Sequence, residues 1–326
     1  MNEPTRSFEV VVVGGGAAGL SGALMLARAR RSVLVIDAAQ PRNAPARGVH
    51  GYLGSEGASP AELLARGRTE VESYGGVVEQ GRVVALERTG DGFTVECEDG
   101  SVVAAQRLLV TTGLVDELPD IPGLAEHWGT GVLHCPYCHG WEVRDEPVGV
   151  VASGPVAVHA SLLWRQWTDR VTLFAHPGQS LAGPEREKLA ARGITVVDTA
   201  VEAVEADGRG VSGVRTADGS VVPVHAVVVP TFMRSRSQLL VDLGLEVVEQ
   251  KMGEHVMGTC VEAGPMGATA APGVWVAGNV TSVTEQVIGA AAAGGRAGAA
   301  INADLVMAEA ERALERGRGV QEAPVA

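Results

Sequence analysis

The 326-residue chain lacks any apolar run of the roughly 18 residues needed to cross a bilayer. It begins without the basic segment, apolar segment and cleavage site of a secretory signal, so we expect a cytoplasmic protein with no membrane partner. Positive charge is also scarce, with 26 lysines and arginines against 39 acidic residues and a formal net charge of -13. That balance argues against binding to nucleic acid or to an anionic membrane surface.

Cysteine is scarce as well, and the four cysteines of a cytoplasmic chain do not form a structural disulfide framework. Cys97 lies in an alternating, strand-like stretch and Cys260 in a glycine-rich region, so we expect two small buried or unreactive thiols. Cys135 and Cys138 form a C-x-x-C in the stretch HCPYCHG at 134–140. A structural zinc site needs four ligands and there is no second C-x-x-C, so we predict no metal, although the flanking histidines could act as ligands.

The C-x-x-C motif has three possible interpretations. CPYC is the dithiol of a glutaredoxin, and CPYCH fits the pattern that attaches a c-type haem. Haem attachment takes place outside the cytoplasm, and a glutaredoxin is a single small domain with its dithiol near the first strand, whereas a long stretch of chain comes first here. The third reading is a redox-active disulfide that exchanges electrons with a flavin, and it requires a nucleotide-binding fold.

The N-terminal segment FEVVVVGGGAAGLSGALMLARARRSVLVID has the pattern of a dinucleotide-binding βαβ unit. An apolar strand over 8–13 leads into a glycine motif, a helix follows to about residue 30, and a second strand ends at Asp37. Gly14 permits the tight turn, Gly16 lets a pyrophosphate approach the backbone, and Gly19 allows close packing of helix and strand. The helix N-terminus faces the phosphates, and Asp37 is placed to accept a hydrogen bond from a ribose hydroxyl.

A second unit repeats this order from about residue 147, in PVGVVASGPVAVHASLLWRQWTDRVTLFAH. DGSVV occurs at 99–103 and again at 218–222, and an apolar strand follows each copy, LLVTTG at 108–113 and VVVPTF at 227–232. We therefore predict an α/β fold with two Rossmann-like nucleotide-binding domains, each a three-layer unit whose parallel sheet carries a β-meander.

The C-terminal part adds a third piece to this fold. GVWVAGNV at 273–280 is predicted to be a buried strand that ends in Gly278-Asn279, and a helix rich in small residues follows from about Thr284. The N-terminal dipole of that helix, near Glu285 and Gln286, could stabilise negative charge on a reduced flavin ring.

The order of these features resembles that of the low-molecular-weight thioredoxin reductases over nearly the whole chain. The resemblance implies an FAD domain formed by residues 1–117 and 250–326, with a pyridine-nucleotide-type domain that carries the dithiol, residues 118–249, inserted between them. It places hinges near 118–122 and 244–253 and implies a homodimer. It also implies that Cys138 faces the flavin and that Cys135 exchanges with substrate.

On the same resemblance, we expect the FAD contacts at Gly14, Gly16, Ala17, Ala18, Gly19, Asp37, Ala38, Arg42, His50, Val84, Thr112, Gly113, Gly278, Asn279, Gln286 and Val287.

Departures from the reductase pattern make NADPH binding doubtful. The second glycine turn reads ASGPVA at 152–157, with Ala152 in place of the first glycine and Pro155 inside the turn. Where the reductases carry an arginine pair for the 2′-phosphate, this chain has His176-Pro177 and no Arg or Lys before Arg186. A phosphate needs persistent positive charge or many donors, although backbone amides with the histidine could still hold NADPH weakly. No acidic residue indicates NADH instead.

His139 follows the second cysteine directly, where the reductases have an acid. A histidine titrates near neutral pH, and its neutral form favours deprotonation of an incoming thiol, which is the step that an oxidase needs. His134 is a second, weaker candidate, and a solvated loop position is the alternative for His139. CPYCHGWE, the altered nucleotide turn and Gly278-Asn279 in place of Gly-Asp resemble the family branch that includes the dithiol oxidases of holomycin and gliotoxin biosynthesis.

That resemblance implies an FAD-dependent dithiol oxidase of a small-molecule dithiol. The substrate would reduce the Cys135–Cys138 disulfide by exchange, Cys138 would pass the electron pair to FAD, and O₂ would reoxidise the flavin and yield H₂O₂. An NAD(P)H-dependent disulfide reductase is the alternative, and a flavin-bearing sensor without turnover is a third hypothesis. An oxidase need not present its dithiol alternately to NADPH and substrate, so we expect the two domains to stay in one arrangement.

Overall fold

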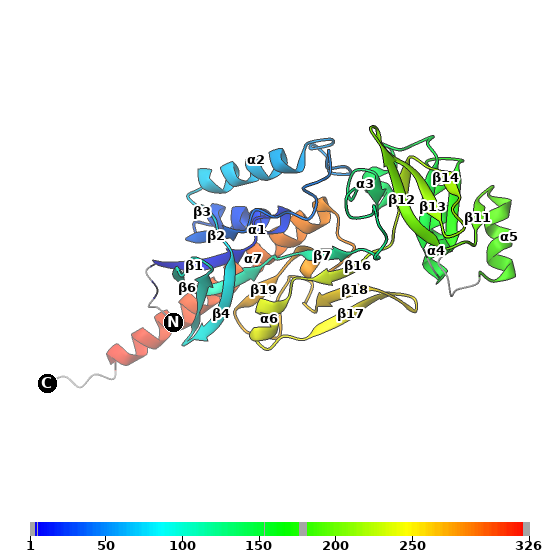
Figure 1. Ribbon diagram of the computed structural model, residues 1–326. Helices are drawn as coiled ribbons and strands as arrows, with labels where there is room; N and C mark the ends of the chain where they lie inside the picture. The colour runs from blue at the N-terminus through cyan, green and yellow to red at the C-terminus, as the bar shows by residue number, and fades with distance from the viewer. Residues whose placement is uncertain (1–3, 5, 153, 176–180, 322–326) are drawn as a thin grey trace.

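The computed structural model describes residue 4 and residues 6–152, 154–175 and 181–321. It confirms the predicted α/β fold of two Rossmann-like domains, which form the two lobes in Figure 1. Ser153, His176 and Pro177, on which part of the NADPH argument depends, lie outside the described residues, so that argument stays a prediction. Among the helices described, none is long and apolar enough to cross a membrane.

The first domain is built on a parallel sheet with the strand order β3-β2-β1-β6, and β19 pairs with the other edge of β6. An antiparallel meander of β4 and β5 continues from the N-terminal half of β6. The elements are β1 (Arg6–Val13), α1 (Ala17–Arg28), β2 (Val33–Asp37), α2 (Pro60–Ser73), β3 (Val77–Gln80), β4 (Val83–Thr89), β5 (Gly92–Cys97), β6 (Val102–Val110), β19 (Val274–Val276), η1 (Gly278–Val280) and α7 (Val287–Gln321).

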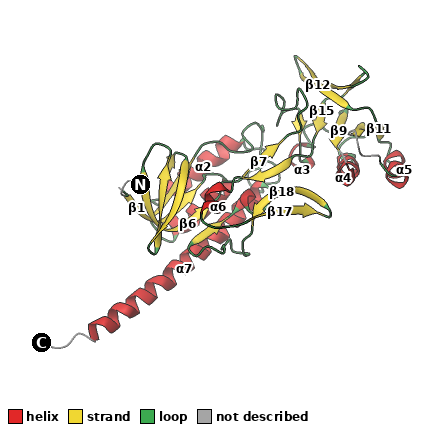
Figure 2. Cartoon of the chain, turned by 60° about the horizontal axis from the view of Figure 1, so that its bottom comes forward, coloured by secondary structure: helices red, strands yellow, loops and turns green. Residues whose placement is uncertain are grey.

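Helix α7 packs directly against α1, at a distance that only glycine allows. A β-carbon on Gly294 would lie 1.9 Å from the carbonyl oxygen of Ala18, and one on Gly298 would lie 2.6 Å from that of Gly22. The helix then continues beyond the body of the domain (Figure 2). The small residues that the sequence shows in this helix therefore serve a helix–helix contact.

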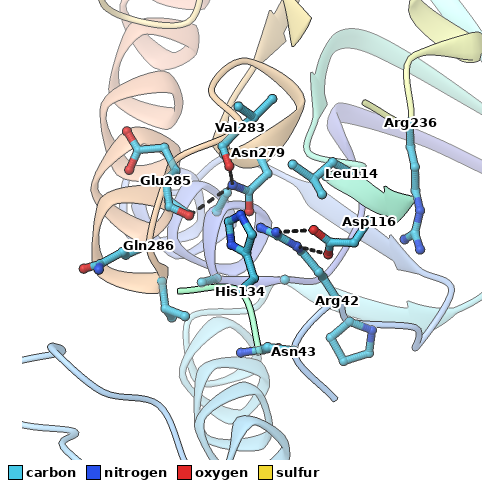
Figure 3. Close-up of a pocket in the computed structure, with 18 of the residues that line it drawn as sticks. Arg42, Asn43, Leu114, Asp116, His134, Arg236, Asn279, Val283, Glu285 and Gln286 are labelled. Atoms are coloured by element: carbon cyan, nitrogen blue, oxygen red, sulfur yellow. Dashed lines mark hydrogen bonds and ion pairs between the residues drawn. The ribbon is translucent and has the colours of Figure 1, made fainter. Parts of the chain in front are cut away.

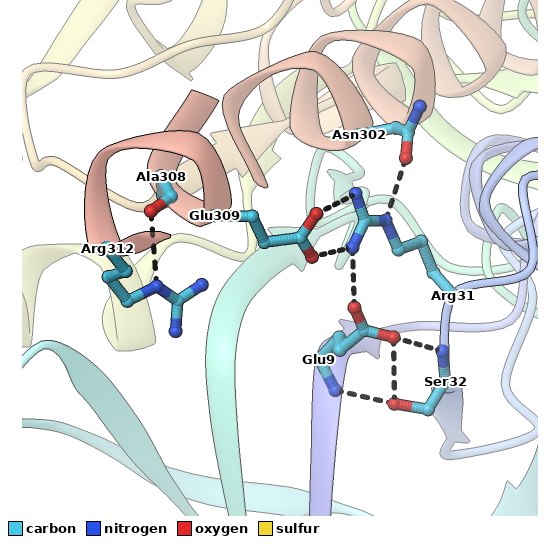
Figure 4. Close-up of polar contacts among 7 residues, drawn as sticks. All are labelled: Glu9, Arg31, Ser32, Asn302, Ala308, Glu309 and Arg312. Atoms are coloured by element: carbon cyan, nitrogen blue, oxygen red, sulfur yellow. Dashed lines mark hydrogen bonds and ion pairs between the residues drawn. The ribbon is translucent and has the colours of Figure 1, made fainter. Parts of the chain in front are cut away.

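Arg31, just after α1, holds the middle of α7 through polar contacts (Figure 4). Its guanidinium pairs with Glu9 at 2.7 Å and with Glu309, and its Nε donates to Asn302 at 2.8 Å. The Arg31 side chain is only 10% exposed. It is thus a mostly buried cation shared by strand β1 and helix α7.

The second domain repeats the plan of the first, which confirms the predicted duplication. Its strand order is β11-β10-β9-β15-β8, and a meander of β12, β13 and β14 precedes β15 as β4 and β5 precede β6. Strand β8 therefore has the edge position that β19 has in the first domain. The elements are β8 (Val132–Leu133), α3 (Pro136–His139), β9 (Val148–Ala152), α4 (Gly154–Trp164), β10 (Val171–Ala175), α5 (Gly183–Ala191), β11 (Thr195–Val197), β12 (Val201–Asp207), β13 (Gly210–Thr216), β14 (Val221–Pro223) and β15 (Ala226–Val228).

The chain crosses between the domains on two strands, β7 (Leu114–Glu117) and β16 (Phe232–Ser235), which pair antiparallel. Strand β16 also pairs with β18 (His255–Val261), which forms a hairpin with β17 (Val247–Met252). The short helix α6 (Gln238–Asp242) lies between β16 and β17 in sequence.

The position of the second crossing corrects the predicted domain boundary. Leu240 and Leu245 are buried in the same core as Val11 of β1. Residues 232–249, assigned from the sequence to the inserted domain, therefore belong to the first domain. The apolar pattern of this segment shows that one face is buried, but it does not show which of the two cores receives that face.

Candidate functional site

A cavity of about 1280 Å³ runs between the two domains, from the C-terminal end of β1 past the dithiol to helix α4. Pockets for a single small ligand are usually about 300–1,000 Å³, so this one has room for a cofactor and a second molecule. It is lined by most of the predicted site residues, namely Gly14, Gly16, Ala17, Ala18, Asp37, Ala38, Arg42, His50, Thr112, Gly113, His134, Cys135, Cys138, His139, Gly278, Asn279, Gln286 and Val287.

The glycine motif leaves an open backbone cradle at the N-terminus of α1. Gly14 has a φ of 104°, and a β-carbon there would lie 2.6 Å from the carbonyl oxygen of Thr111. A β-carbon on Gly16 would meet nothing within 4 Å, so the backbone at Gly16 is open to the cavity. This arrangement fits a pyrophosphate at the helix N-terminus.

Two predicted cofactor contacts do not line the cavity. Gly19 instead packs against β1, where a β-carbon would lie 1.9 Å from the carbonyl oxygen of Gly14, and this is the close packing that the motif predicts. Val84 is 45% exposed, and its neighbour Val83 is buried and lines the cavity. Successive side chains of a strand point to opposite faces of the sheet, so Val83 and not Val84 presents its side chain to the cavity, and an FAD contact at Val84 stays a prediction.

Asp37 lies at the end of β2 as predicted, but it already has a cation beside it. Its Oδ2 accepts a 2.7 Å hydrogen bond from Arg68 of α2, and its Oδ1 accepts from the backbone N–H of Ala39 at 3.2 Å. The carboxylate is thus held by two donors at the edge of the cavity. Sequence reasoning missed Arg68, because nothing in the pattern of α2 distinguishes it from other surface arginines.

Asn279 uses its amide nitrogen within the protein. The Nδ2 atom donates to the carbonyl oxygen of Ser282 at 3.1 Å, and to those of Val283 and Glu285 at 3.4 and 3.0 Å. The last two contacts are drawn in Figure 3. These bonds stabilise the turn that leads into α7. The Oδ1 atom accepts no hydrogen bond from the described part of the chain, so it is available to a ligand in the cavity.

The dithiol lies at the start of the short helix α3, where Cys135 is the N-cap residue. A hydrogen bond from the Cys138 thiol, aided by the backbone N–H groups of Cys138 and Tyr137, lowers the pKa of Cys135 to about 7. The same thiol–thiol bond and burial raise the pKa of Cys138. The pair is thus built so that Cys135 takes the thiolate charge. Cys97 and Cys260 are buried away from this site, as predicted.

The histidines around the dithiol differ in their partners. Burial lowers the pKa of both His134 and His139. Both ring nitrogens of His139 are buried and make no hydrogen bond of regular geometry with the described residues. The nearby backbone of Cys135 and the charge of Glu142 only partly oppose the effect of burial on its pKa. His50 is engaged, with Nδ1 2.6 Å from Glu56 and Nε2 3.4 Å from Glu142, which follows the dithiol helix. The contact with Glu142 links the loop of the first domain to the dithiol segment.

Arg42 has a partner that the sequence did not reveal. Its Nε and Nη2 each lie 2.6 Å from a carboxylate oxygen of Asp116, whose side chain is 4% exposed. Thr231 donates to the same carboxylate at 2.9 Å. Burial would raise the pKa of Asp116, but the Arg42 hydrogen bonds outweigh it and the pKa is lowered. Within the described residues, no group of three His, Cys, Asp or Glu side chains is arranged to hold a metal ion.

A model of the pyridine nucleotide-disulphide oxidoreductase family matches residues 8–294. The chain belongs to this family. It is 35% identical over 253 residues to the thioredoxin reductase tcpT of Claviceps purpurea, covering 73% of this chain and 78% of tcpT. It is 29% identical over 316 residues to the thioredoxin reductase sirT of Leptosphaeria maculans, covering 90% and 93% of the two chains.

Solved structures give the same result. The crystal structure of HlmI is similar with a TM-score of 0.88 and 40% identity, over 97% of this chain and 99% of HlmI. An oxidoreductase from Agrobacterium tumefaciens has a TM-score of 0.85 at 34% identity, over 92% of this chain and 99% of its own. This chain is therefore a thioredoxin reductase-like flavoprotein, an oxidoreductase that acts on sulfur groups.

Proposed function

We propose that this protein is an FAD-dependent dithiol oxidase that closes an intramolecular disulfide in a small-molecule dithiol. The observation that carries the proposal is the buried His139, whose two ring nitrogens make no regular hydrogen bond with the described residues and which lines the cavity that also holds Cys135 and Cys138. Because burial lowers its pKa, the imidazole is neutral at pH 7 and can accept a proton from an incoming thiol.

The residues at the other end of the cavity fit FAD. The open backbone at Gly16 suits the pyrophosphate, the Asp37 carboxylate suits a ribose hydroxyl, and the Oδ1 atom of Asn279 suits a hydroxyl of the ribityl chain. When bound there, FAD would accept the electron pair of the dithiol and pass it to O₂, which becomes H₂O₂.

The dithiol exchanges with substrate in two steps. A substrate thiol gives its proton to His139 and attacks the sulfur of Cys135, so that a mixed disulfide forms, the Cys135–Cys138 bond breaks and Cys138 leaves as a thiolate. The second substrate thiol gives its proton to that Cys138 thiolate and attacks the substrate sulfur of the mixed disulfide. The cyclic disulfide is then complete, and Cys135 leaves as a thiolate that accepts a hydrogen bond from the Cys138 thiol. A thiol with a low pKa is a good leaving group, and the pKa of Cys135 is about 7. The substrate has lost two protons and two electrons, and the electrons lie on the enzyme dithiol.

The alternative is an NAD(P)H-dependent disulfide reductase, and the names of tcpT and sirT favour it. The two functions differ in the source of electrons. In the second domain, Ala152 is the buried last residue of β9 and not a turn glycine, which supports the oxidase. A homodimer in the cytoplasm remains our expectation for either function.

The test is the anaerobic absorbance of the flavin-loaded protein, with NADPH and then with a dithiol such as dithiothreitol. We expect the dithiol to bleach the flavin, NADPH to leave it oxidised, and air to restore the colour with one H₂O₂ per dithiol. Cys138→Ser should abolish bleaching by the dithiol, while Cys97→Ser, the matched change at a buried thiol outside the cavity, should not. Rapid bleaching by NADPH with slow return in air would establish the reductase instead.

A further inference from the structure

The ion pair of Arg42 and Asp116 joins three segments that are far apart in the sequence. Arg42 lies in the loop after β2, Asp116 in the outgoing crossing strand β7, and Thr231 next to the returning strand β16. The pair therefore lies where both connections between the domains meet the cavity. A buried carboxylate is stable only when it is paired and hydrogen-bonded, and Asp116 has both kinds of partner.

The two members of the ion pair act differently on the dithiol. The positive charge of Arg42 contributes a lowering of the pKa at both Cys135 and Cys138, although the pKa of Cys138 is raised overall. Asp116 is not among the groups that act on either thiol. In Figure 3 the guanidinium nitrogen that is not bound to Asp116 points toward His134 and Asn279. The free side of the guanidinium thus faces His134, which directly precedes Cys135 in the chain, and Asn279 of the expected flavin site.

We propose that Asp116 is a positioning residue that, with Thr231, fixes the guanidinium of Arg42 beside the Cys135–Cys138 pair, where its charge stabilises the thiolate that exchange leaves on the enzyme. Two parallel N–H···O bonds restrict a guanidinium far more than a single contact does. The proposal rests on the proposed function for the role of the dithiol, but its placement of charge can be measured without turnover.

Other titratable groups near the dithiol do not replace this cation. Burial lowers the pKa of His134 and His139, so both are neutral near pH 7. His50 lies between two carboxylates, so that part of the site holds no net positive charge. The charged and titratable groups of the dithiol's surroundings are Arg42, Asp116, His134, His139, His159, His50, Glu56 and Glu142. Arg42 is the arginine of this set, and a guanidinium is a permanent cation.

The experiment measures the rate at which iodoacetamide alkylates Cys135 in the reduced, flavin-loaded protein without oxygen, as a function of pH, with mass spectrometry of the peptide as the readout. Arg42→Gln should move the midpoint up by roughly one pH unit, since a nearby charge commonly shifts a pKa by that amount or more. Glu117→Gln is the matched control, because the Glu117–Arg234 pair joins the same two strands but lies exposed at the surface.

The variant Asp116→Asn distinguishes two roles of Asp116, which are to hold the guanidinium of Arg42 in place and to neutralise its charge. If Asp116 positions Arg42, the loosened guanidinium leaves the dithiol and the midpoint rises as in Arg42→Gln. If Asp116 only neutralises Arg42, its removal strengthens the positive charge and the midpoint falls, which would overturn the proposal. Thr231→Val removes a hydrogen bond to Asp116 but keeps both charges, and it should raise the midpoint by a smaller amount. The proposal can therefore still be tested if the Asp116 variant folds poorly. An unchanged midpoint in Thr231→Val and Arg42→Gln also overturns it, whatever the protein turns over.

Discussion

At the scale of single residues, the neutral His139 gives the oxidase proposal its pH dependence. Its pKa is lowered by burial, so at a given pH more of the base form is present than for an ordinary histidine, whose pKa is about 6.5. We expect the rate of flavin reduction by dithiol to rise with pH to a plateau, with a midpoint below that value, because the protonated imidazole cannot accept the thiol proton.

His139→Gln should slow flavin reduction by about 100-fold, the low end of what a general base contributes. Its rate should then keep rising toward the ordinary thiol pKa of about 8.5, since only substrate that is already ionised reacts. Anaerobic stopped-flow absorbance measures both effects. His225→Gln, at an exposed histidine outside the cavity, is the control, and equal loss in both variants would remove His139 from the mechanism.

At the scale of elements, the contact between α1 and α7 gives a prediction from two adjacent glycines. A β-carbon on Gly294 would lie 1.9 Å from a carbonyl oxygen of α1, while one on Gly295 would meet only the Ser21 hydroxyl at 3.4 Å. Both changes to alanine raise helix propensity by about 1 kcal/mol. We expect Gly294→Ala to destabilise the protein by about 1–3 kcal/mol net through overpacking, and Gly295→Ala to be neutral or stabilising.

Thermal unfolding of the two glycine variants, followed by circular dichroism, shows whether the helix contact or helix propensity controls stability. The melting temperature should fall for Gly294→Ala and should not fall for Gly295→Ala. Equal shifts in both would mean that propensity, and not the helix contact, controls stability there.

The polar anchor of α7 provides a second prediction at this scale. Arg31→Met removes the cation that Glu9 and Glu309 share, so that Glu9 keeps only its hydrogen bonds from Ser32 and Glu309 loses its ion pair (Figure 4). We expect a loss of about 2 kcal/mol, typical of a lost charged hydrogen bond, and faster amide hydrogen exchange in α7 beyond Asn302. Arg312→Met is the control, because among the described residues the one hydrogen bond of Arg312 goes to a carbonyl of its own helix, and it acts on Glu309 by charge alone. Faster exchange spread evenly over the chain would show that Arg31 supports the whole domain and not α7.

At the scale of the whole molecule, several contacts hold the two domains in the arrangement that places the dithiol at the cavity. The crossing strands β7 and β16 are paired, Arg42 is tied to Asp116, and His50 reaches Glu142 beside the dithiol helix. We expect the small-angle X-ray scattering profile of the flavin-loaded protein to be the same before and after anaerobic reduction by dithiol. A change in the radius of gyration on reduction would show that the domains move during the reaction.

The features that the sequence determined are local in the chain. The glycine turn at Gly14 and Gly16, the acid at the end of β2 and the C-x-x-C each need only a few neighbouring residues, and periodic apolar runs predict the strands around them. The duplication was visible because both domains keep the same order of these short patterns. Within a strand, however, pattern alone missed which of Val83 and Val84 faces the cavity.

Only the tertiary structure decided which distant side chains share the site. Arg42 and Asp116 are 74 positions apart, Asp116 and Thr231 are 115 apart, and Arg68 reaches Asp37 from a separate helix. The assignment of residues 232–249 to the first domain was decided in the same way, by the burial of Leu240 and Leu245 in the core that contains Val11. The sequence shows a charged residue or an apolar face but not the residues that contact it, because those contacts depend on how the strands cross and how the domains pack.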